Sequence, residues 1–213
     1  FGQVKLYVPR GNYKMVAIAA ATDNPSKDNK VSIKSKTEVV FPKNEATDMF
    51  YTYQDIAVKD REERQNYDCI LKRGVTVLQL DSRSEVRPDY IKSFKCTITG
   101  NCGNVFNPST GYCLEKTTLT KTYDISGDRF KAKRFLFTIY FFLGADDVTD
   151  ITLATQSTDT EDKVAKDLSF KNVHMVKGKM TIYKGPFLST HSAVSFTIDS
   201  PTIPDSGFST EFE

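Results

Sequence analysis

Apolar and polar side chains alternate at the start of the chain. Val4, Leu6 and Val8 occupy every second position, which is the period of a strand with one buried face. Residues 9–12 combine a proline with a glycine, as a tight turn requires, and residues 13–21 are apolar at nearly every position, as in a strand buried on both faces. The pattern therefore predicts a β-hairpin that enters a sandwich core at once. Because the entry is so abrupt, we also expect the chain to lack its natural N-terminus and one strand.

Short strand patterns recur along the rest of the chain about every 10–20 residues, with turn signals between them. This spacing is typical of an antiparallel β-sandwich, and no helix patterns alternate with the strands as a parallel α/β sheet would need. The strand-like segments are residues 31–33, 39–41, 49–53, 56–58, 67–80, 94–99, 114–123, 135–143, 151–153, 168–170, 180–183 and 194–198.

A wholly polar stretch, residues 59–66, is the best linker candidate in the chain. It predicts two all-β domains in tandem. We expect an incomplete N-terminal β-sandwich domain over residues 1–65 and a C-terminal β-sandwich domain over residues 66–213.

Composition narrows the range of partners. The chain has 29 Lys and Arg against 27 Asp and Glu in 213 residues, a net charge of +2, which offers no electrostatic reason to bind nucleic acid or anionic lipid. Its densest apolar run, residues 135–143, is far shorter than the ~20 residues of a membrane-spanning helix. We therefore expect neither a nucleic-acid partner nor a membrane span.

The four cysteines leave two interpretations open. Cys102 and Cys113 bracket a turn-rich loop and could form a disulfide, and Cys69 and Cys96 each lie in a predicted strand and could pair across neighbouring strands. Alternatively all four are free thiols, with Cys69 and Cys96 acting as small apolar core residues. No CxxC spacing or Cys/His cluster suggests zinc.

No catalytic constellation stands out in the sequence. The chain has only two histidines, His174 at the end of an apolar strand and His191 in a polar loop. Neither forms a recognisable catalytic pair with a nucleophile. Three acids in residues 146–150 could gather around calcium, but their spacing follows no calcium loop and suits a solvated turn. We therefore expect no catalytic, cofactor or metal site, and a protein that is not an enzyme.

Arg73 is the most unusual charge in the chain. It interrupts an otherwise apolar alternation that includes Leu71, Val75 and Val77. Since a guanidinium should not be buried unpaired, the structural interpretation is a buried or interdomain Arg paired with a carboxylate or with backbone carbonyls. The alternative is a contact with a ligand.

Several of these segments, in this order, resemble the fimbrillin-like proteins of Bacteroides-type bacteria, in particular the minor or anchor-type fimbrial subunits. The resemblance covers nearly the whole chain, and the order and spacing of the motifs carry it. Departures occur at Gly74, His174 and Gly178, where the family usually has Ala, Pro and Asn, and three of the cysteines fall outside the pattern. The matching segments are Phe1-Gly2, residues 6–17, 35–42, 47–51, 71–75, 94–100, 106–112 and 170–181.

This resemblance implies two transthyretin-like, Greek-key antiparallel β-sandwich domains in tandem, the first without its N-terminal strand. It also implies export as a lipoprotein to the outer membrane, with membrane contact only through an N-terminal lipid anchor absent from this chain. The expected function is that of a structural or adhesive subunit of cell-surface fimbriae, in which a neighbouring subunit donates a β-strand. The expected groove for that strand is lined by Val4, Leu6, Val8, Tyr13, Met15 and Ala17.

Two other functions compete with the fimbrial one. An outer-surface module that binds carbohydrate or host protein could stack sugars on Tyr51, Tyr53, Tyr112 or Tyr140. A secreted hydrolase is the least favoured, because the sequence offers no nucleophile–base pair.

Overall fold

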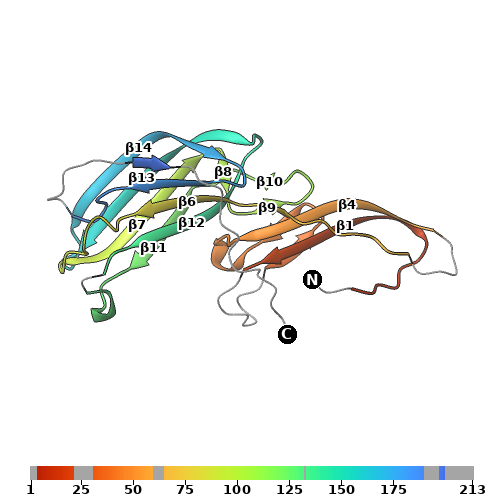
Figure 1. The fold of residues 1–213 in the computed structure, drawn as a ribbon, viewed down its shortest axis with the longest axis horizontal. Helices are drawn as coiled ribbons and strands as arrows, with labels where there is room; N and C mark the ends of the chain where they lie inside the picture. Colours follow the sequence, from red (N-terminus) through yellow and green to blue (C-terminus); the bar gives the residue numbers. More distant parts are fainter. Residues whose placement is uncertain (1–3, 22–30, 60–64, 132, 190–196, 200–213) are drawn as a thin grey trace.

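The computed structural model describes residues 4–21, 31–59, 65–131, 133–189 and 197–199, and this part of the chain is all-β (Figure 1). Two single-turn 3-10 helices, Pro42–Asn44 and Asp128–Phe130, are its only helical turns. None of the described helices is long and apolar enough to cross a membrane. The strands are β1 (Gly11–Ala20), β2 (Ser32–Ser35), β3 (Glu38–Val40), β4 (Met49–Val58), β5 (Lys72–Arg73), β6 (Thr76–Asp81), β7 (Ile91–Gly100), β8 (Cys102–Gly103), β9 (Phe106–Asn107), β10 (Tyr112–Cys113), β11 (Leu119–Asp124), β12 (Leu136–Leu143), β13 (Val148–Asp159), β14 (Val164–Val176), β15 (Met180–Lys184) and β16 (Thr197–Asp199).

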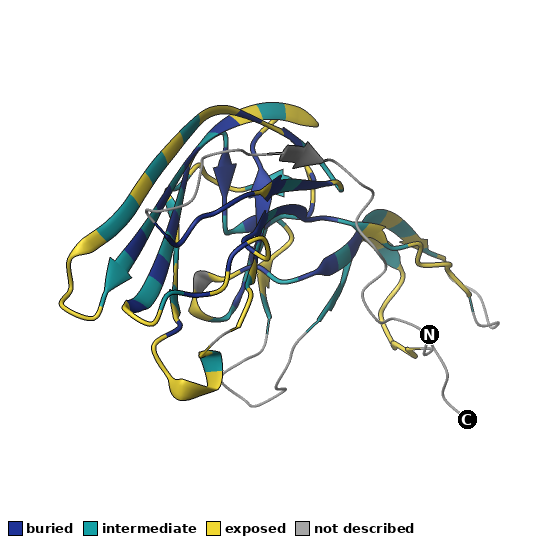
Figure 2. Ribbon diagram, turned by 60° about the vertical axis from the view of Figure 1, so that its left-hand side comes forward, coloured by how far each residue is buried: buried dark blue, intermediate teal, exposed yellow. Residues whose placement is uncertain are grey.

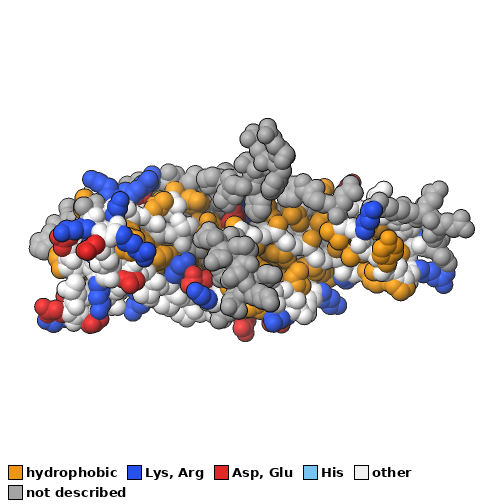
Figure 3. All heavy atoms as spheres, turned by 90° about the horizontal axis from the view of Figure 1, so that it is seen from below, with side chains coloured by type: hydrophobic (Ala, Val, Ile, Leu, Met, Phe, Trp, Pro, Cys, Tyr) orange, Lys and Arg blue, Asp and Glu red, His pale blue; other side chains and the backbone are white. Residues whose placement is uncertain are grey.

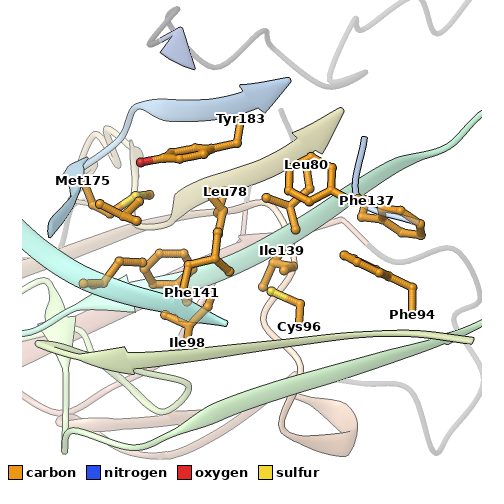
Figure 4. Packing of buried hydrophobic residues seen from close by; sticks show 14 of the residues in the cluster. Leu78, Leu80, Phe94, Cys96, Ile98, Phe137, Ile139, Phe141, Met175 and Tyr183 are labelled. Carbon is orange, nitrogen blue, oxygen red and sulfur yellow. The ribbon is translucent and has the colours of Figure 1, made fainter. Parts of the chain in front are cut away.

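Two of the four sheets face each other as a β-sandwich. One sheet has the strand order β11-β7-β13-β14 and the other β16-β15-β6-β12-β8. Their inner faces share one core, in which the ring of Phe94 stacks on Phe137 at 4.2 Å between centroids (Figure 4). The apolar alternation at Phe94, Cys96 and Ile98 thus predicted the buried face of β7 correctly.

The sandwich departs in one pair from the antiparallel arrangement that the sequence predicts. β15 runs parallel to β6, with Met180 opposite Val77. The chain passes from β14 in one sheet to β15 in the other through the tight turn at Gly178, and a strand that changes sheets need not run antiparallel to its new neighbour.

The buried carboxylate of Glu85 binds the chain segment that follows β15 at the end of the sandwich. Phe187 and Leu188 are buried in the core. The Glu85 carboxylate accepts hydrogen bonds from the backbone N–H of Leu188 at 2.7 Å and of Ser189 at 3.1 Å, and from the hydroxyl of Ser82 at 2.5 Å. These three donors satisfy a charge that would otherwise be costly to bury.

The other two sheets, β1-β4-β5 and β10-β9-β3-β2, form a smaller region beside the sandwich. Its core is small and includes Met49, Tyr51 and Phe106, with the rings of Tyr51 and Phe106 packed edge to face at 4.7 Å. Each of these sheets combines strands from both sides of residue 65: β4 pairs with β5, and β3 pairs with β9. Figure 2 shows that buried residues concentrate in the sandwich and become sparse toward the far end of β1 and β4.

The predicted N-terminal hairpin is wrong. Residues 4–10 are irregular and exposed, and the first strand begins at Gly11. Residues 15–20 of β1 are half-exposed rather than buried on both faces. The physical reason is that, among the residues that the structure describes, β1 has a partner strand on one side only. Its apolar side chains therefore have too few neighbours to be buried.

Candidate functional site: the open edge of β1

β1 and β4 form a two-stranded ribbon that extends away from the sandwich (Figure 1). They pair antiparallel along their whole length, from Gly11 opposite Val58 to Ala20 opposite Met49. Among the described residues no strand pairs with the other side of β1. The ribbon therefore presents an edge of unpaired backbone N–H and C=O groups about ten residues long.

The hydrogen bonds at the base of the ribbon show which residues of β1 present these groups. The N–H of Gly74 donates to the carbonyl of Met49, on the side of β4 away from β1. Because backbone groups alternate in direction along an antiparallel strand, Ala20, opposite Met49, directs its own groups outward. By the same alternation, the outward N–H and C=O groups of β1 belong to Asn12, Lys14, Val16, Ile18 and Ala20.

The open edge continues an apolar surface. Ile18 and Ala20 pack against the small core, and Val16 follows on the same face by the period of two. Figure 3 shows apolar side chains gathered over the half of the molecule that carries the ribbon, while charged side chains are more frequent over the sandwich. An extended segment added to β1 would therefore gain both hydrogen bonds and apolar contacts.

The opposite edge of the ribbon is partly covered. β5 pairs with β4 only at Phe50 and Tyr51. Further along, the hydroxyl of Tyr67 donates to the carbonyl of Ala57 at 2.6 Å, and the side-chain amide of Gln54 donates to the carbonyl of Asp68 at 3.1 Å. β1 is thus the more open edge of the two.

The six residues expected to line a strand groove do not form one surface. Val4, Leu6 and Val8 lie in the irregular N-terminal segment and are 81%, 75% and 44% exposed. Tyr13, Met15 and Ala17 lie on β1, but at alternate positions to Ile18 and therefore on the face turned away from the small core. The hydroxyl of Tyr13 donates to the carbonyl of Pro9 at 2.8 Å, which joins the irregular segment to the start of β1.

Arg73 fixes the base of the ribbon. Its guanidinium makes two hydrogen bonds to the carboxylate of Asp48, Nε to Oδ1 at 2.9 Å and Nη2 to Oδ2 at 3.0 Å. The side chains are 12% and 2% exposed, and the guanidinium also lies over the ring of Phe50 at 4.6 Å. This bidentate pair connects β5 to the residue that precedes β4, and no ligand is needed to explain it.

All four cysteines are free thiols in the structure. Of the two interpretations that the sequence left open, the structure has the free thiols and not the Cys69–Cys96 and Cys102–Cys113 disulfides. Cys69 is exposed in an irregular segment rather than in a strand, whereas Cys96 and Cys102 are buried in the sandwich core. Burial raises the pKa of both core thiols to about 12, so they are neutral, small apolar residues.

The four tyrosines proposed as a sugar-stacking platform do not form one. Tyr51 is buried, and Tyr53, Tyr112 and Tyr140 are half-buried. The ammonium of Lys177 lies 3.6 Å from the ring centroid of Tyr112 and covers that ring. Tyr51 and Tyr112 are therefore closed to a stacking sugar, and the four rings do not form one exposed platform.

Two carboxylates of the acidic loop at residues 146–150 are paired with nearby side chains. The hydroxyl of Tyr112 donates to Asp147 at 2.8 Å and lowers the pKa of that carboxyl, with Lys177 contributing less. Asp150 lies 3.1 Å from Nδ1 of His174, which is exposed on the edge strand β14. The described residues contain no group of three His, Cys, Asp or Glu side chains placed to hold a metal, and His191 lies outside them.

A second feature is a cavity of about 300 Å³ beside β11 and β12. No motif in the sequence pointed to it. The one available signal is Lys121, an inward-facing cation between Leu119 and Tyr123 on a strand that alternates half-buried and exposed residues. We call this space the edge cavity; its lining is Lys43, Glu45, Ala46, Cys96, Ile98, Asn104, Thr118, Leu119, Thr120, Lys121, Ile139 and Tyr140.

Comparison with known proteins places the chain in a family and gives it structural relatives. A family model described as a family of unknown function, DUF6562, matches residues 6–207. No curated protein matches the chain. Among solved structures, a candidate adhesin from Bacteroides ovatus ATCC 8483 is similar with a TM-score of 0.50 and 12% identity, over 77% of this chain and 66% of that chain.

Two further structures are less similar. A candidate cell adhesion protein from the same organism has a TM-score of 0.43 and 11% identity over 92% of this chain and 68% of that chain. A candidate adhesin from Bacteroides thetaiotaomicron VPI-5482 has a TM-score of 0.42 and 12% identity over 94% of this chain and 80% of that chain. The likeness to the first Bacteroides ovatus structure, of which the chain spans just under two thirds, shows a shared fold.

Proposed function

We propose that this chain, which belongs to the DUF6562 family, is a structural or adhesive protein of the cell surface that joins its partners by β-strand addition. The observation that carries the proposal is the open edge of β1, with its outward backbone groups at Asn12, Lys14, Val16, Ile18 and Ala20. A soluble protein normally protects such an edge with charges, prolines or bulges. From Met15 to Ala20 this edge has none of them.

Strand addition is a physically sufficient mode of attachment for this edge. Backbone hydrogen bonds supply affinity, and alternate side chains of the added strand supply specificity. Here one set of those side chains would extend the small core beside Ile18 and Ala20. The fold shared with the candidate adhesin from Bacteroides ovatus supports a surface role.

The finer form of the proposal is a fimbrillin-like subunit of the minor or anchor type. In this form the chain comprises two transthyretin-like domains in tandem, the first completed by a donor strand from another fimbrial subunit. It would be exported as a lipoprotein and held at the outer membrane by an N-terminal lipid. A role as stalk, tip or anchor subunit would follow from which partner supplies the strand.

Hydrogen exchange with a strand peptide tests the proposal. The probe is a synthetic peptide with the sequence of β4, Met49–Val58, because this sequence already pairs with β1. We expect the peptide to slow exchange at the outward amides of Val16, Ile18 and Ala20 and to raise the melting temperature, since a ligand that binds only the folded state stabilises it. Absence of both effects would contradict strand addition at this edge.

A matched pair of variants locates the binding. Val16→Pro removes an outward N–H but none of the hydrogen bonds between β1 and β4, because proline is tolerated where its nitrogen faces solvent. It should abolish the protection, whereas Val16→Thr, which keeps the N–H and the side-chain shape, should retain it. Equal protection in both variants would place the peptide elsewhere on the molecule.

A further inference from the structure

The edge of β1 lacks the protection that another long outer strand of this protein carries. β14 is also an outer strand among the described sheets. It carries Asp167 and Lys171, has a positive φ of 55° at Asn172, and pairs with β13 through a ladder that register shifts interrupt. Charges and bulges of this kind keep an edge from pairing with another chain. From Met15 to Ala20, β1 has no charge and pairs with β4 without a register shift, so a further strand can add here.

The two halves of β1 differ in the size of their side chains. The half before Val16 is bulky and the half after it is rich in alanine, in the order Gly-Asn-Tyr-Lys-Met-Val-Ala-Ile-Ala-Ala. An antiparallel copy of β1 reverses this order and therefore sets each bulky half against a small one. A parallel copy in register would set bulky side chains against bulky ones. The strand thus matches an antiparallel copy of itself better than a parallel one.

One antiparallel register uses the whole open edge. With Val16 opposite Val16 of a second copy, all five outward residues of β1 face outward residues of the other strand. Each such pair exchanges two hydrogen bonds, about ten in all. A two-fold axis at Lys14 would set two like charges opposite each other, which is destabilising. An axis at Ile18 would leave Asn12 and Lys14 beyond the end of the facing strand, so Val16 is the favoured centre.

The side chains also fit this register on both faces of the ribbon. On the face turned away from the small core, a bulky side chain meets a small one, as at Tyr13 opposite Ala19. On the other face Lys14 lies opposite Ile18. Its alkyl stem can cover Ile18 while its ammonium keeps the ion pair with Asp55 of its own chain. No like charges of β1 lie opposite each other, so the edge is self-complementary in charge as well as in size.

We infer that the partner of the β1 edge is a second copy of this chain, paired antiparallel about a two-fold axis at Val16. The two ribbons then form one continuous sheet, in the order β5-β4-β1-β1-β4-β5. Because both chains use the same surface, the contact closes on itself and produces a dimer rather than a filament. The inference rests on the proposed function, since it names the partner for the same edge.

Analytical ultracentrifugation of the unmodified chain tests the inference. A small contact made mainly of backbone hydrogen bonds should have a dissociation constant on the order of 10–100 μM, so samples from about 1 to 500 μM should change from monomer to dimer. Hydrogen exchange at the amides of Val16 and Ile18 should slow over the same range. A monomer throughout, an assembly larger than a dimer, or a dimer that leaves these amides unprotected would overturn the inference.

The peptide experiment separates this inference from the proposed function. Protection of the β1 edge by the β4 peptide in a chain that stays monomeric would overturn the second copy as partner and leave strand addition standing. Absence of both the peptide effect and the dimer would overturn both.

A pair of charge variants tests the position of the axis. Val16→Glu and Val16→Lys each place two like charges opposite each other, and each should weaken the dimer by at least about tenfold. An equimolar mixture places a carboxylate opposite an ammonium and should restore the dimer, which also shows that both variants are folded. The control is Val164→Glu, at a valine of β14 that is 55% exposed, and it should leave the dimer unchanged. A dimer that neither variant weakens, or that the mixture does not restore, would overturn the pairing at Val16.

Discussion

Leu153 in β13 and Ile18 in β1 are both aliphatic residues within long strands, yet Leu153 is fully buried and Ile18 is half-exposed. β13 has a strand on each side, β7 and β14, and a second sheet over its inner face. Within the described part of the chain, β1 pairs with β4 alone and contacts the small core at one end. The number of neighbouring strands and sheets, which is set by topology, therefore decides how much of an apolar strand is buried.

The largest difference should appear when an apolar residue is truncated in each region. Phe94→Ala removes a ring that packs on Phe137 and Phe187 in the sandwich core, and it should lower the free energy of unfolding by about 3–5 kcal/mol. Ile18→Ala should cost much less, because its side chain is already half in water. Urea denaturation of the two variants measures both values, and equal losses would contradict the comparison.

A polar contact rather than apolar burial should dominate the stability of the ribbon. Arg73→Ala leaves the Asp48 carboxylate buried without its guanidinium, so we expect a loss of about 3 kcal/mol and a clearly lower melting temperature. The control is Lys163→Ala, which removes an ammonium from an ion pair with Glu161 whose side chains are 72% and 70% exposed and should change stability little. An unchanged melting curve for Arg73→Ala would mean that the pair does not hold β5 to β4.

Alkaline pH should destabilise the sandwich through its two core thiols. Folding raises the pKa of Cys96 and of Cys102 from 9.0 to about 12. Each thiol therefore contributes its full stability below pH 9 and loses it as the pH rises from 9 to 12, with a slope of at most about 1.4 kcal/mol per pH unit for each thiol. Urea midpoints measured across this range should fall less steeply in Cys96→Val.

Cys69→Ser provides the control for that measurement. Cys69 is exposed, so its replacement should leave the dependence of stability on pH between 9 and 12 unchanged. A slope that is the same in Cys96→Val as in the unmodified protein would show that Cys96 ionises as readily folded as unfolded.

The smallest effect is expected at the exposed end of the ribbon. Lys14 forms an ion pair with Asp55, but the two side chains are 44% and 74% exposed, and water and salt screen such pairs. Lys14→Ala should leave the denaturation midpoint unchanged within error. A clear decrease would show that this end of the ribbon is held more firmly than its exposure indicates.

The sequence predicted the all-β fold because the period of two is a local property. The alternation at Phe94, Cys96 and Ile98 and the apolar run at residues 135–143 became β7 and β12 as expected. The same alternation at Val4, Leu6 and Val8 did not become a strand, because these residues pair with none of the strands that the structure describes. Periodicity predicts which face a strand can bury, but pairing partners come from distant parts of the chain.

The candidate site was only partly predictable for the same reason. Resemblance to a known family directed attention to a groove of six residues, of which Tyr13, Met15 and Ala17 lie on the open strand β1 and Val4, Leu6 and Val8 do not. Which side of β1 is open, and which of its residues face the small core, depends on the register with β4. The edge cavity was missed entirely, since Glu45 and Lys121 are far apart in sequence and only the pairing of sheets brings them together.

The position of Phe106 has a consequence for the order in which the protein can fold during synthesis. Phe106 is fully buried in the small core beside Tyr51, and its strand pairs with Val39. Domains usually fold in order as the ribosome releases them, the N-terminal one first. Here the strands before residue 59 cannot complete their core until β9 and then β12, which contributes Phe142, have left the ribosome. Until then the apolar faces of β1 and β4 are exposed together, and they are the part of the nascent chain in greatest need of a chaperone.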